Sequence, residues 1–424
     1  MWLRNLHNSE LFKNTSTLIT GTAVAQLIPI LLQPVLRRYY PPEIFGAYAV
    51  YLSLVGILII ISSFKYELAI ILPGKDKEAT NIVLLAQLLN FGFNFVLFCL
   101  IIVFSHRILK LLNLPEKYTL FLYLVPVGTF LYNLYISINY WLIRQKAFLP
   151  VSVNKFVRRG FEGLFQVLFK WIGFSNGLVF GDLIGHFANN ISGLIQSLKK
   201  EFRFGDLSIC KLKYVAKKYV DYPRYNLVPS FMSACSFLLP MIFINKFFST
   251  QYAGYFDLSK LLLSLPFALI ATSISNVLLQ RTSEKFKSKI SFKREIISMF
   301  LIVFTIAVIE VVIIEFFGID LFRIVFGAEW IISGKISTIL VWSYAFNFIT
   351  SSFSSIFISL KKIKQLSIWQ LIYFISIISL ILFRNLNFMD FLKIYVIIEL
   401  ICYLANFVLI FTIVVKYENK ILLA

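Results

Sequence analysis

The sequence predicts an all-α membrane protein of about 12 transmembrane helices, arranged as two six-helix bundles with both termini in the cytoplasm. Three observations support this prediction: an excess of apolar residues, a regular alternation of apolar runs with short basic segments, and a weak internal repeat. Hydrophobic residues make up 59% of the 424-residue chain, and its mean hydropathy is +0.80. These values exceed what the surface of a water-soluble protein tolerates.

Apolar runs of about 20 residues, the length that crosses a bilayer, recur along the whole chain. The expected spans are residues 13–36, 44–71, 80–105, 118–143, 151–172, 177–198, 225–248, 255–281, 294–317, 331–360, 365–383 and 388–415. The fifth span is interrupted by charged residues, and omitting it would invert the predicted topology of every later span. The preceding residues, Met1–Lys13, contain no short apolar core followed by a small-residue cleavage site, so we expect the first span to be retained and not to be a signal peptide.

Positive charges are distributed unevenly between the segments that join the expected spans. With both termini inside, most of the 41 lysine and arginine residues fall in cytoplasmic segments. Short cytoplasmic loops of membrane proteins carry such an excess, which supports the predicted orientation. Because the basic residues cluster between apolar runs, the net charge of +20 does not indicate a nucleic-acid partner.

The longest polar stretch, Lys199 to Arg224, divides the chain near its midpoint. We therefore expect an N-terminal bundle over residues 1–210 and a C-terminal bundle over residues 211–424. The two halves share a weak repeat, in which Leu36, Arg38, Tyr39, Tyr40, Glu43 and Gly46 line up with Ile244, Lys246, Phe247, Phe248, Gln251 and Gly254. Since an even number of spans separates the copies, both have the same orientation, as in transporters built from parallel repeats.

The fifth span carries its polar residues on one side. At about 100° per residue, a single arc of about 120° holds Lys155, Arg158, Arg159, Glu162, Gln166 and Lys170. A charge at the bilayer centre costs roughly 2.5–3.5 kcal/mol on insertion scales, so this face should contact protein or water. We expect it to line a cavity; a helix lying flat at the interface, or structural ion pairs, would give the same pattern.

The sixth span has a polar face of its own. Asp182 and His186 share this face, and Gly177, Gly181 and Gly185 follow one another at four-residue intervals beside it. Small residues at this spacing let the backbones of two helices approach closely. We therefore expect the sixth span to pack tightly against a neighbour.

Cationic side chains outnumber acidic ones on these polar faces, which favours an anionic substrate. Arginine in particular donates paired hydrogen bonds to phosphate oxygens. The candidate substrate-binding residues, drawn also from the first, second and eighth spans, are Arg158, Arg159, Lys155, Lys65, Lys260, Gln26 and Arg37. An alternative role for Lys65 is to extend to the cytoplasmic headgroups, because it follows an apolar run long enough to cross the bilayer.

Acidic residues within the spans are too few and too scattered for paired-carboxylate catalysis. They are candidates for binding a coupling ion, either Na⁺ or H⁺. These candidates are Asp257, Glu310, Glu399 and Asp182. For each of them an ordinary packing or ion-pair role is an equal alternative, as for Asp257 with Lys260 three residues later.

The sequence lacks the common motifs of nucleotide-binding, hydrolytic and metal-binding proteins. It contains no glycine-rich phosphate loop, HExxH helix or GxSxG elbow, and its four cysteines have no metal or redox spacing. We therefore expect neither an enzyme nor a bound metal or cofactor. Transport would then be driven by ion or substrate gradients.

Five stretches of the chain resemble one known family. They are Gly21–Pro29, Tyr39–Gly46, Tyr66–Pro73, Tyr222–Tyr225 and Gly254–Lys260. The chain resembles the Wzx-like flippases of O-antigen and capsule repeat units, in the multidrug/oligosaccharidyl-lipid/polysaccharide exporter superfamily. Such flippases usually carry arginine where this chain has Lys65 and Lys260, so the charge is kept and the two-pronged guanidinium is lost.

The resemblance implies a substrate, a location and partners. The substrate would be an oligosaccharide repeat unit on undecaprenyl pyrophosphate, moved from the cytoplasmic to the outer leaflet of the bacterial inner membrane by alternating access, as in O-antigen, lipopolysaccharide or capsule synthesis. Membrane lipids, and other polysaccharide assembly proteins as a further candidate, would be its partners. The cationic face of residues 155–170 suits the pyrophosphate of such a carrier.

Other functions remain open from the sequence. A multidrug exporter of the same superfamily would need an acidic, aromatic cavity for cationic drugs, which the excess of cations disfavours. A membrane polysaccharide polymerase or ligase would need a larger external loop than residues 318–330 provide. A peptidoglycan-precursor flippase usually has two further helices, and a structural scaffold would not explain charge within the spans.

Overall fold

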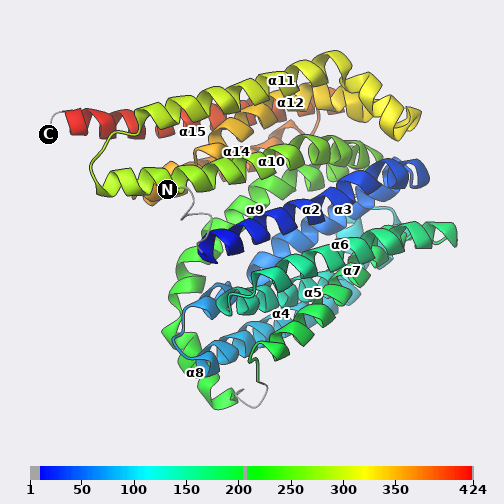
Figure 1. Cartoon of the computed structure of the whole chain (residues 1–424). Coiled ribbons are helices and arrows are strands. Elements are labelled where there is room, and N and C mark those ends of the chain that lie inside the picture. The colour runs from blue at the N-terminus through cyan, green and yellow to red at the C-terminus, as the bar shows by residue number, and fades with distance from the viewer. Residues whose placement is uncertain (1–9, 204–207, 423–424) are drawn as a thin grey trace. The chain divides into compact units, whose positions relative to one another are not determined.

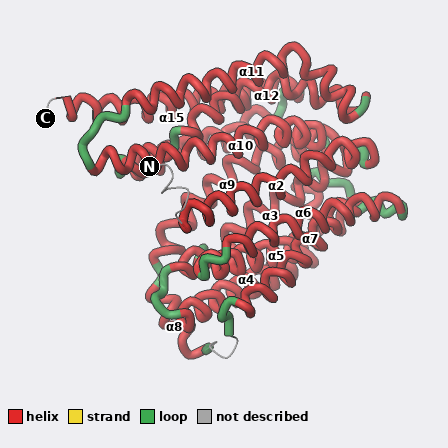
Figure 2. The backbone as a smooth tube through the Cα atoms, viewed as in Figure 1, coloured by secondary structure: helices red, strands yellow, loops and turns green. Residues whose placement is uncertain are grey.

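The structure is a computed structural model that describes residues 10–203 and 208–422 (Figure 1). Within these residues every regular element is a helix, as Figure 2 shows. The chain forms two compact units that divide between Leu238 and Leu239, inside helix α9 (Asp221–Phe247). The bundle boundary predicted at residues 210–211, within the polar stretch Lys199–Arg224, stays a prediction. Both chain ends, predicted to be cytoplasmic, lie outside the described residues.

The N-terminal unit is built from long helices joined by short turns. Its elements before α9 are α2 (Glu10–Tyr39), α3 (Pro42–Ser62), η1 (Tyr66–Ile71), α4 (Asp76–Leu112), η2 (Glu116–Tyr118), α5 (Thr119–Arg144), α6 (Phe148–Trp171), α7 (Gly177–Lys199) and α8 (Ile209–Lys218). In this unit α6 packs against both α2 and α7, and α5 packs against α3, α4 and α7.

The C-terminal unit has the same long-helix character. Its elements after α9 are α10 (Thr250–Lys287), α11 (Lys293–Phe326), η4 (Ala328–Trp330), α12 (Ile331–Ser352), α13 (Ser355–Ser359), α14 (Ile363–Ile378), η5 (Ser379–Phe383) and α15 (Phe388–Leu422). Helix α12 lies at the centre of the packing, in contact with α10, α11 and α15. The rings of Phe267 and Phe348 stack there with centroids 4.3 Å apart, which joins α10 to α12.

Each of the expected spans contains one long helix, which confirms the predicted all-helical membrane architecture. Within residues 10–203 and 208–422, eight segments are apolar and long enough to cross a membrane: Pro42–Ser62, Asp76–Leu112, Glu116–Arg144, Asp221–Phe247, Thr250–Lys287, Lys293–Phe326, Ile363–Phe383 and Phe388–Ile421. The chain is therefore a multi-pass membrane protein. Helices α2, α6, α7 and α12 fall outside this group, and α6 carries the charged face described above.

Two expected spans are wrong in detail because the backbone breaks inside them. The span at 44–71 ends at Ser62, since Phe64 and Lys65 have φ of 52° and 64°. Consecutive side-chain-bearing residues in the left-handed region cannot continue a right-handed helix. The span at 331–360 likewise stops at Ser352 before the short helix α13.

The polar stretch at the midpoint is also more ordered than a loop. Helix α8 packs against α4, with Val215 and Tyr219 buried in a cluster that includes Tyr66. Lys218 donates a hydrogen bond to Glu78 of α4 and so attaches α8 at its end. Four lysines among its apolar residues obscured this amphipathic helix in the sequence.

The internal repeat coincides with helix boundaries. In the first half α2 ends at Tyr39 and α3 begins at Pro42. In the second half α9 ends at Phe247 and α10 begins at Thr250, the positions that the repeat assigns to the same turn. The two halves therefore start with equivalent helix pairs.

Candidate functional site

Helices α6 and α7 approach closely along the glycines of α7, as expected. A Cβ atom at Gly185 would lie 2.7 Å from the backbone oxygen of Arg158, and one at Gly181 would lie 2.5 Å from Cγ of Gln166. Any larger side chain at either glycine would force the helices apart. The polar face of α6 is thus held directly against α7.

Arg158 occupies the centre of this contact. Its Nη2 atom lies 3.6 Å from Oδ1 of Asp182 on α7, and the side chains are 12% and 4% exposed. The same Oδ1 lies 3.7 Å from Nε2 of His186, one turn further along α7. In the described residues Arg158 Nε, Asp182 Oδ1 and His186 Nδ1 are buried without a hydrogen bond. Such unsatisfied polar atoms are costly in a dry interior, so this cluster can accept further polar partners.

Two tyrosines of α5 form the aromatic side of the cluster. The guanidinium carbon of Arg158 lies 5.1 Å from the ring centroid of Tyr132 and 5.8 Å from that of Tyr135. His186 also packs on Tyr132, with ring centroids 4.9 Å apart. These contacts are within range for cation–π attraction. Three helices, α5, α6 and α7, therefore position this one arginine.

Arg159 points to a second carboxylate. Its Nη1 atom donates to Oε1 and Oε2 of Glu162, at 3.1 and 2.8 Å. The arginine side chain is 31% exposed, against 9% for Glu162. Both residues line a small cavity of about 30 Å³ together with Gln33 and Tyr48. The pair thus borders a space about the size of one water molecule.

The remaining N-terminal candidates on α2 and α6 differ in exposure. Arg37 is buried, donates from Nε to Gln33 Oε1 at 2.9 Å, and lies 3.5 Å from the ring centroid of Phe45. Gln26 and Lys155 are half-buried. Lys155 lies about one turn before Arg158 on the same face, so the structure keeps it near the arginine cluster.

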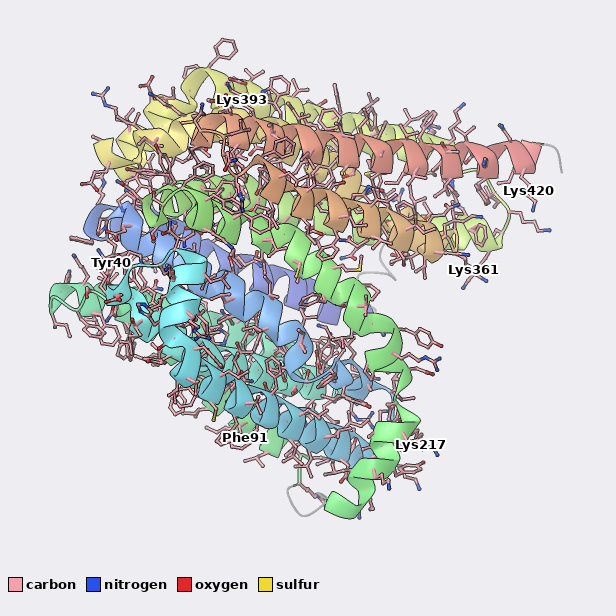
Figure 3. All side chains as sticks on the ribbon, turned by 180° about the vertical axis from the view of Figure 1, so that it is seen from behind. Tyr40, Phe91, Lys217, Lys361, Lys393 and Lys420 are labelled. Atoms are coloured by element: carbon pink, nitrogen blue, oxygen red, sulfur yellow. The ribbon has the colours of Figure 1, made fainter. Side chains whose placement is uncertain are left out.

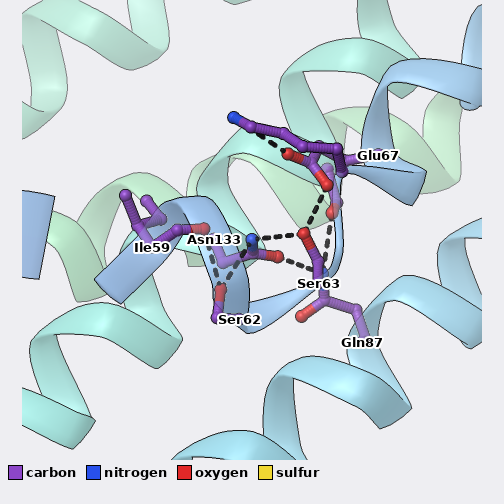
Figure 4. Close-up of polar contacts among 8 residues, drawn as sticks. Ile59, Ser62, Ser63, Glu67, Gln87 and Asn133 are labelled. Atoms are coloured by element: carbon purple, nitrogen blue, oxygen red, sulfur yellow. Dashed lines mark hydrogen bonds and ion pairs between the residues drawn. The ribbon is translucent and has the colours of Figure 1, made fainter. Parts of the chain in front are cut away.

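Lys65 lies in a separate polar network at the break after α3. Figure 4 shows Ser62, Ser63, Glu67, Gln87 and Asn133 of this network. Its Nζ atom is 3.7 Å from Oε1 of the buried Glu67, and Ser63 donates to the other oxygen of that carboxylate. Asn133 of α5 donates to Ser63 at 2.9 Å and accepts from Gln87 of α4 at 3.3 Å. The network joins three helices to the strained turn, so Lys65 is tied to protein groups.

The C-terminal unit also holds a buried carboxylate, Glu399 of α15. Its Oε1 atom accepts from Tyr395 at 2.7 Å and from Tyr373 at 3.0 Å, with the Tyr403 hydroxyl at 3.5 Å. The hydroxyls of Tyr373 and Tyr403 are 3.0 Å apart, and Asn347 donates to Tyr403 at 2.7 Å. Oxygen-rich surroundings of this kind suit a proton or a small hard cation.

The other candidates in the C-terminal unit differ in their distance from Glu399. Lys260 on α10 is buried and is close enough to Glu399 and Asp257 to interact with both charges. Glu310 lies apart on α11, where its Oε2 is buried without a hydrogen bond. Among the residues that the structure describes, no three His, Cys, Asp or Glu side chains form a metal site.

The sequence indicated the charged candidate residues but not the side chains that they contact. It did not pair Arg159 with Glu162, although the two lie three residues apart on one helix face. The tyrosines around Arg158 and Glu399 gave no usable signal, because aromatic residues are abundant throughout the chain, at 17%. Only the packing of distant helices brings them to the charged groups.

Comparison with known proteins places the fold and the family. Residues 11–286 match the family model described as polysaccharide biosynthesis protein. No curated protein matches the chain. The structure resembles an inward-facing multidrug resistance MATE family transporter of the MOP superfamily, with a TM-score of 0.75 and 13% identity over 94% of this chain and 99% of the other.

Two further solved structures share the fold. The lipid II flippase MurJ, in an inward closed conformation, has a TM-score of 0.69 and 15% identity over 95% of this chain and 90% of the other. A MOP superfamily transporter from Pyrococcus furiosus, described by the reverse polarity of its binding pocket, has a TM-score of 0.63 and 13% identity over 96% of both chains. At these identities the likeness concerns the fold alone. The chain belongs to the polysaccharide biosynthesis protein family and has the fold of MOP superfamily transporters.

Proposed function

We propose that this protein is a flippase for lipid-linked oligosaccharides. It moves repeat units attached to undecaprenyl pyrophosphate from the cytoplasmic to the outer leaflet of the bacterial inner membrane by alternating access. The family match to polysaccharide biosynthesis proteins supports a substrate of this class. Its products would serve O-antigen, lipopolysaccharide or capsule assembly, together with other polysaccharide assembly proteins.

The observation that carries the proposal is the state of the two arginines on α6. Arg158 forms an ion pair with Asp182, and Arg159 forms one with Glu162, within an apolar helical unit. Guanidinium groups bind phosphate oxygens through paired hydrogen bonds, and each of these carboxylates is a ligand that phosphate can replace. A pyrophosphate would therefore exchange with the carboxylates without leaving either arginine unpaired.

This exchange also gives a physical basis for ion coupling. A proton or Na⁺ that neutralises Asp182 weakens its attraction for Arg158 and releases the guanidinium for substrate. Coupling requires that the ion bind one conformation better than the other. We propose Asp182 as the first coupling candidate, with Glu399, Asp257 and Glu310 in the C-terminal unit as the others. Lys155, Lys65, Lys260, Gln26 and Arg37 are proposed as further substrate contacts.

Reconstitution into liposomes tests the proposal. A fluorescent oligosaccharide on undecaprenyl pyrophosphate is placed in one leaflet, and its appearance in the other is followed with and without an H⁺ or Na⁺ gradient. We expect protein-dependent movement that an Arg159→Ala variant reduces and an Arg107→Ala variant does not. Arg107 is an exposed arginine at the end of α4 and so serves as a matched control.

The same liposomes test the nearest alternative. A multidrug exporter would move a cationic dye and leave the lipid-linked sugar in place. Dye transport without lipid movement, across several sugar compositions, would replace our proposal with this alternative.

A further inference from the structure

A cavity of about 450 Å³ opens at one end of the C-terminal unit. Its apolar wall is formed by Phe286 of α10, Leu409 and Ile413 of α15, and Leu360, which directly follows α13. Leu360 and Ile413 belong to the buried core of the unit. The interior of the cavity is thus suited to hydrocarbon.

The rim of the cavity is cationic. Thr412, Lys416 and Lys420 lie at four-residue intervals along one face of α15, and Lys362 directly precedes the first residue of α14. All three lysines are exposed. The partial positive charge at the start of a helix adds to that of Lys362. Three cations therefore surround an opening into an apolar space.

Nearby acidic groups do not cancel this charge. Glu418 of α15 is buried and accepts a hydrogen bond from the backbone N–H of Phe292 at 3.0 Å, away from the rim. Lys285 is the residue that pairs with Glu295. The rim lysines thus remain available for an external anion.

The location of the cavity points to the membrane surface. Helices α14 and α15 belong to segments able to cross a membrane, and the cavity lies beside the first turn of α14 and the last turns of α15. Figure 3 shows Lys361 and Lys420 at this end of the unit and Lys393 at the opposite end. The charge asymmetry of the sequence predicts that this end is cytoplasmic. At the cytoplasmic surface of the membrane, lipid headgroups lie next to the acyl chains, so one cavity can contact both parts of a lipid.

We propose that this cavity binds a phospholipid with an anionic headgroup from the adjoining leaflet. Its phosphate contacts Lys362, Lys416 and Lys420, and one acyl chain lies against Leu360 and Ile413. Basic pockets between membrane helices are suited to anionic headgroups, to which each nearby lysine adds attraction. The site is distinct from the arginine cluster of α6 and does not depend on the proposed substrate.

The test uses the full chain, purified in detergent and titrated with phosphatidylglycerol or phosphatidylcholine while bound lipid is counted by native mass spectrometry. We expect tighter binding of phosphatidylglycerol to the wild type. A Lys362→Gln/Lys416→Gln/Lys420→Gln variant should lose at least about tenfold in this affinity. A control variant, Lys211→Gln/Lys213→Gln/Lys217→Gln, removes three exposed lysines of α8 and should keep it. Equal affinity in both variants would overturn the site.

A second variant separates a lipid site from a phosphate site. Thr412→Trp fills the cavity but keeps the three lysines, so a lipid with its chain inside should be excluded. Inorganic phosphate should not compete with phosphatidylglycerol at equal concentration. Unchanged lipid binding by Thr412→Trp, or full competition by phosphate, would show that only the charged rim binds and would contradict the proposal.

Discussion

Arg158 and Asp182 face each other across the α6–α7 contact, with Nη2 of the arginine 3.6 Å from Oδ1 of the aspartate. This distance is that of an ion pair without a short hydrogen bond, and both side chains are nearly buried. Removing only the arginine would leave the carboxylate uncompensated, which costs roughly 3–5 kcal/mol in a buried pair. The pair is therefore better tested by substitutions that keep shape.

An Asp182→Asn substitution should strengthen binding of the carrier lipid. It removes the charge that competes with pyrophosphate for Arg158, and a gain of about 1.4 kcal/mol corresponds to about tenfold in affinity. Binding of undecaprenyl pyrophosphate to purified protein measures this change. Asp320→Asn on the exposed face of α11 is the matched control. Weaker binding by Asp182→Asn would mean that the carboxylate positions the arginine instead of competing for it.

Gly185→Ala should destabilise the N-terminal unit. The added Cβ would lie 2.7 Å from the backbone oxygen of Arg158, which cannot rotate away, and overpacking of this kind costs about 1–3 kcal/mol. Thermal unfolding in detergent should show a lower midpoint. Gly160→Ala on α6 provides the control, because nothing lies within 4 Å of its added Cβ. Alanine there should be neutral or stabilising, and equal destabilisation by both substitutions would contradict the close α6–α7 contact.

Glu399 allows charge and packing to be separated. Glu399→Gln keeps an oxygen that accepts from Tyr395 and Tyr373, so folding should be retained while the response of transport to an ion gradient is lost. Glu399→Ala leaves these buried hydroxyls without an acceptor, which costs about 1–3 kcal/mol each. Transport with and without a gradient, together with thermal unfolding, distinguishes the two effects. A gradient response in Glu399→Gln equal to that of the exposed control Glu315→Gln would remove Glu399 from the coupling candidates.

The attachment of α8 should depend on the charge of Lys218. Its hydrogen bond to Glu78 raises the pKa of Lys218 above the usual range of lysine. The attachment is thus fully present below the ordinary lysine pKa and is lost as pH rises through the raised value. Lys218→Met should accelerate tryptic cleavage within α8 more than Lys217→Met, which removes the same kind of cleavage site. Equal cleavage of the two variants would show that the apolar contacts of Val215 and Tyr219 hold α8 without this hydrogen bond.

Hydropathy was sufficient to predict where the long helices lie, because a bilayer requires apolar runs of fixed length. It could not predict the break after Ser62, since the break depends on two left-handed residues and on Asn133 donating to Ser63 from another helix. The amphipathic face of α6 was evident because helical periodicity alone arranges it. Whether that face is free or paired depends on Asp182 and Glu162. Only helix packing shows that Asp182 pairs with Arg158. The pairing of Glu162 with Arg159 was not predicted, although the two lie three residues apart on α6.

The most direct test compares one oligosaccharide on two carriers in the same liposomes. One carrier has the pyrophosphate of undecaprenyl pyrophosphate, and the other joins the same sugar to the prenyl chain through an uncharged linker. We expect the protein to move only the pyrophosphate form. An Arg158→Gln/Asp182→Asn variant, which removes both charges of the pair together, should move it at least about tenfold more slowly, the equivalent of about 1.4 kcal/mol. Equal movement of both carriers, or an unchanged rate in the variant, would contradict this expectation.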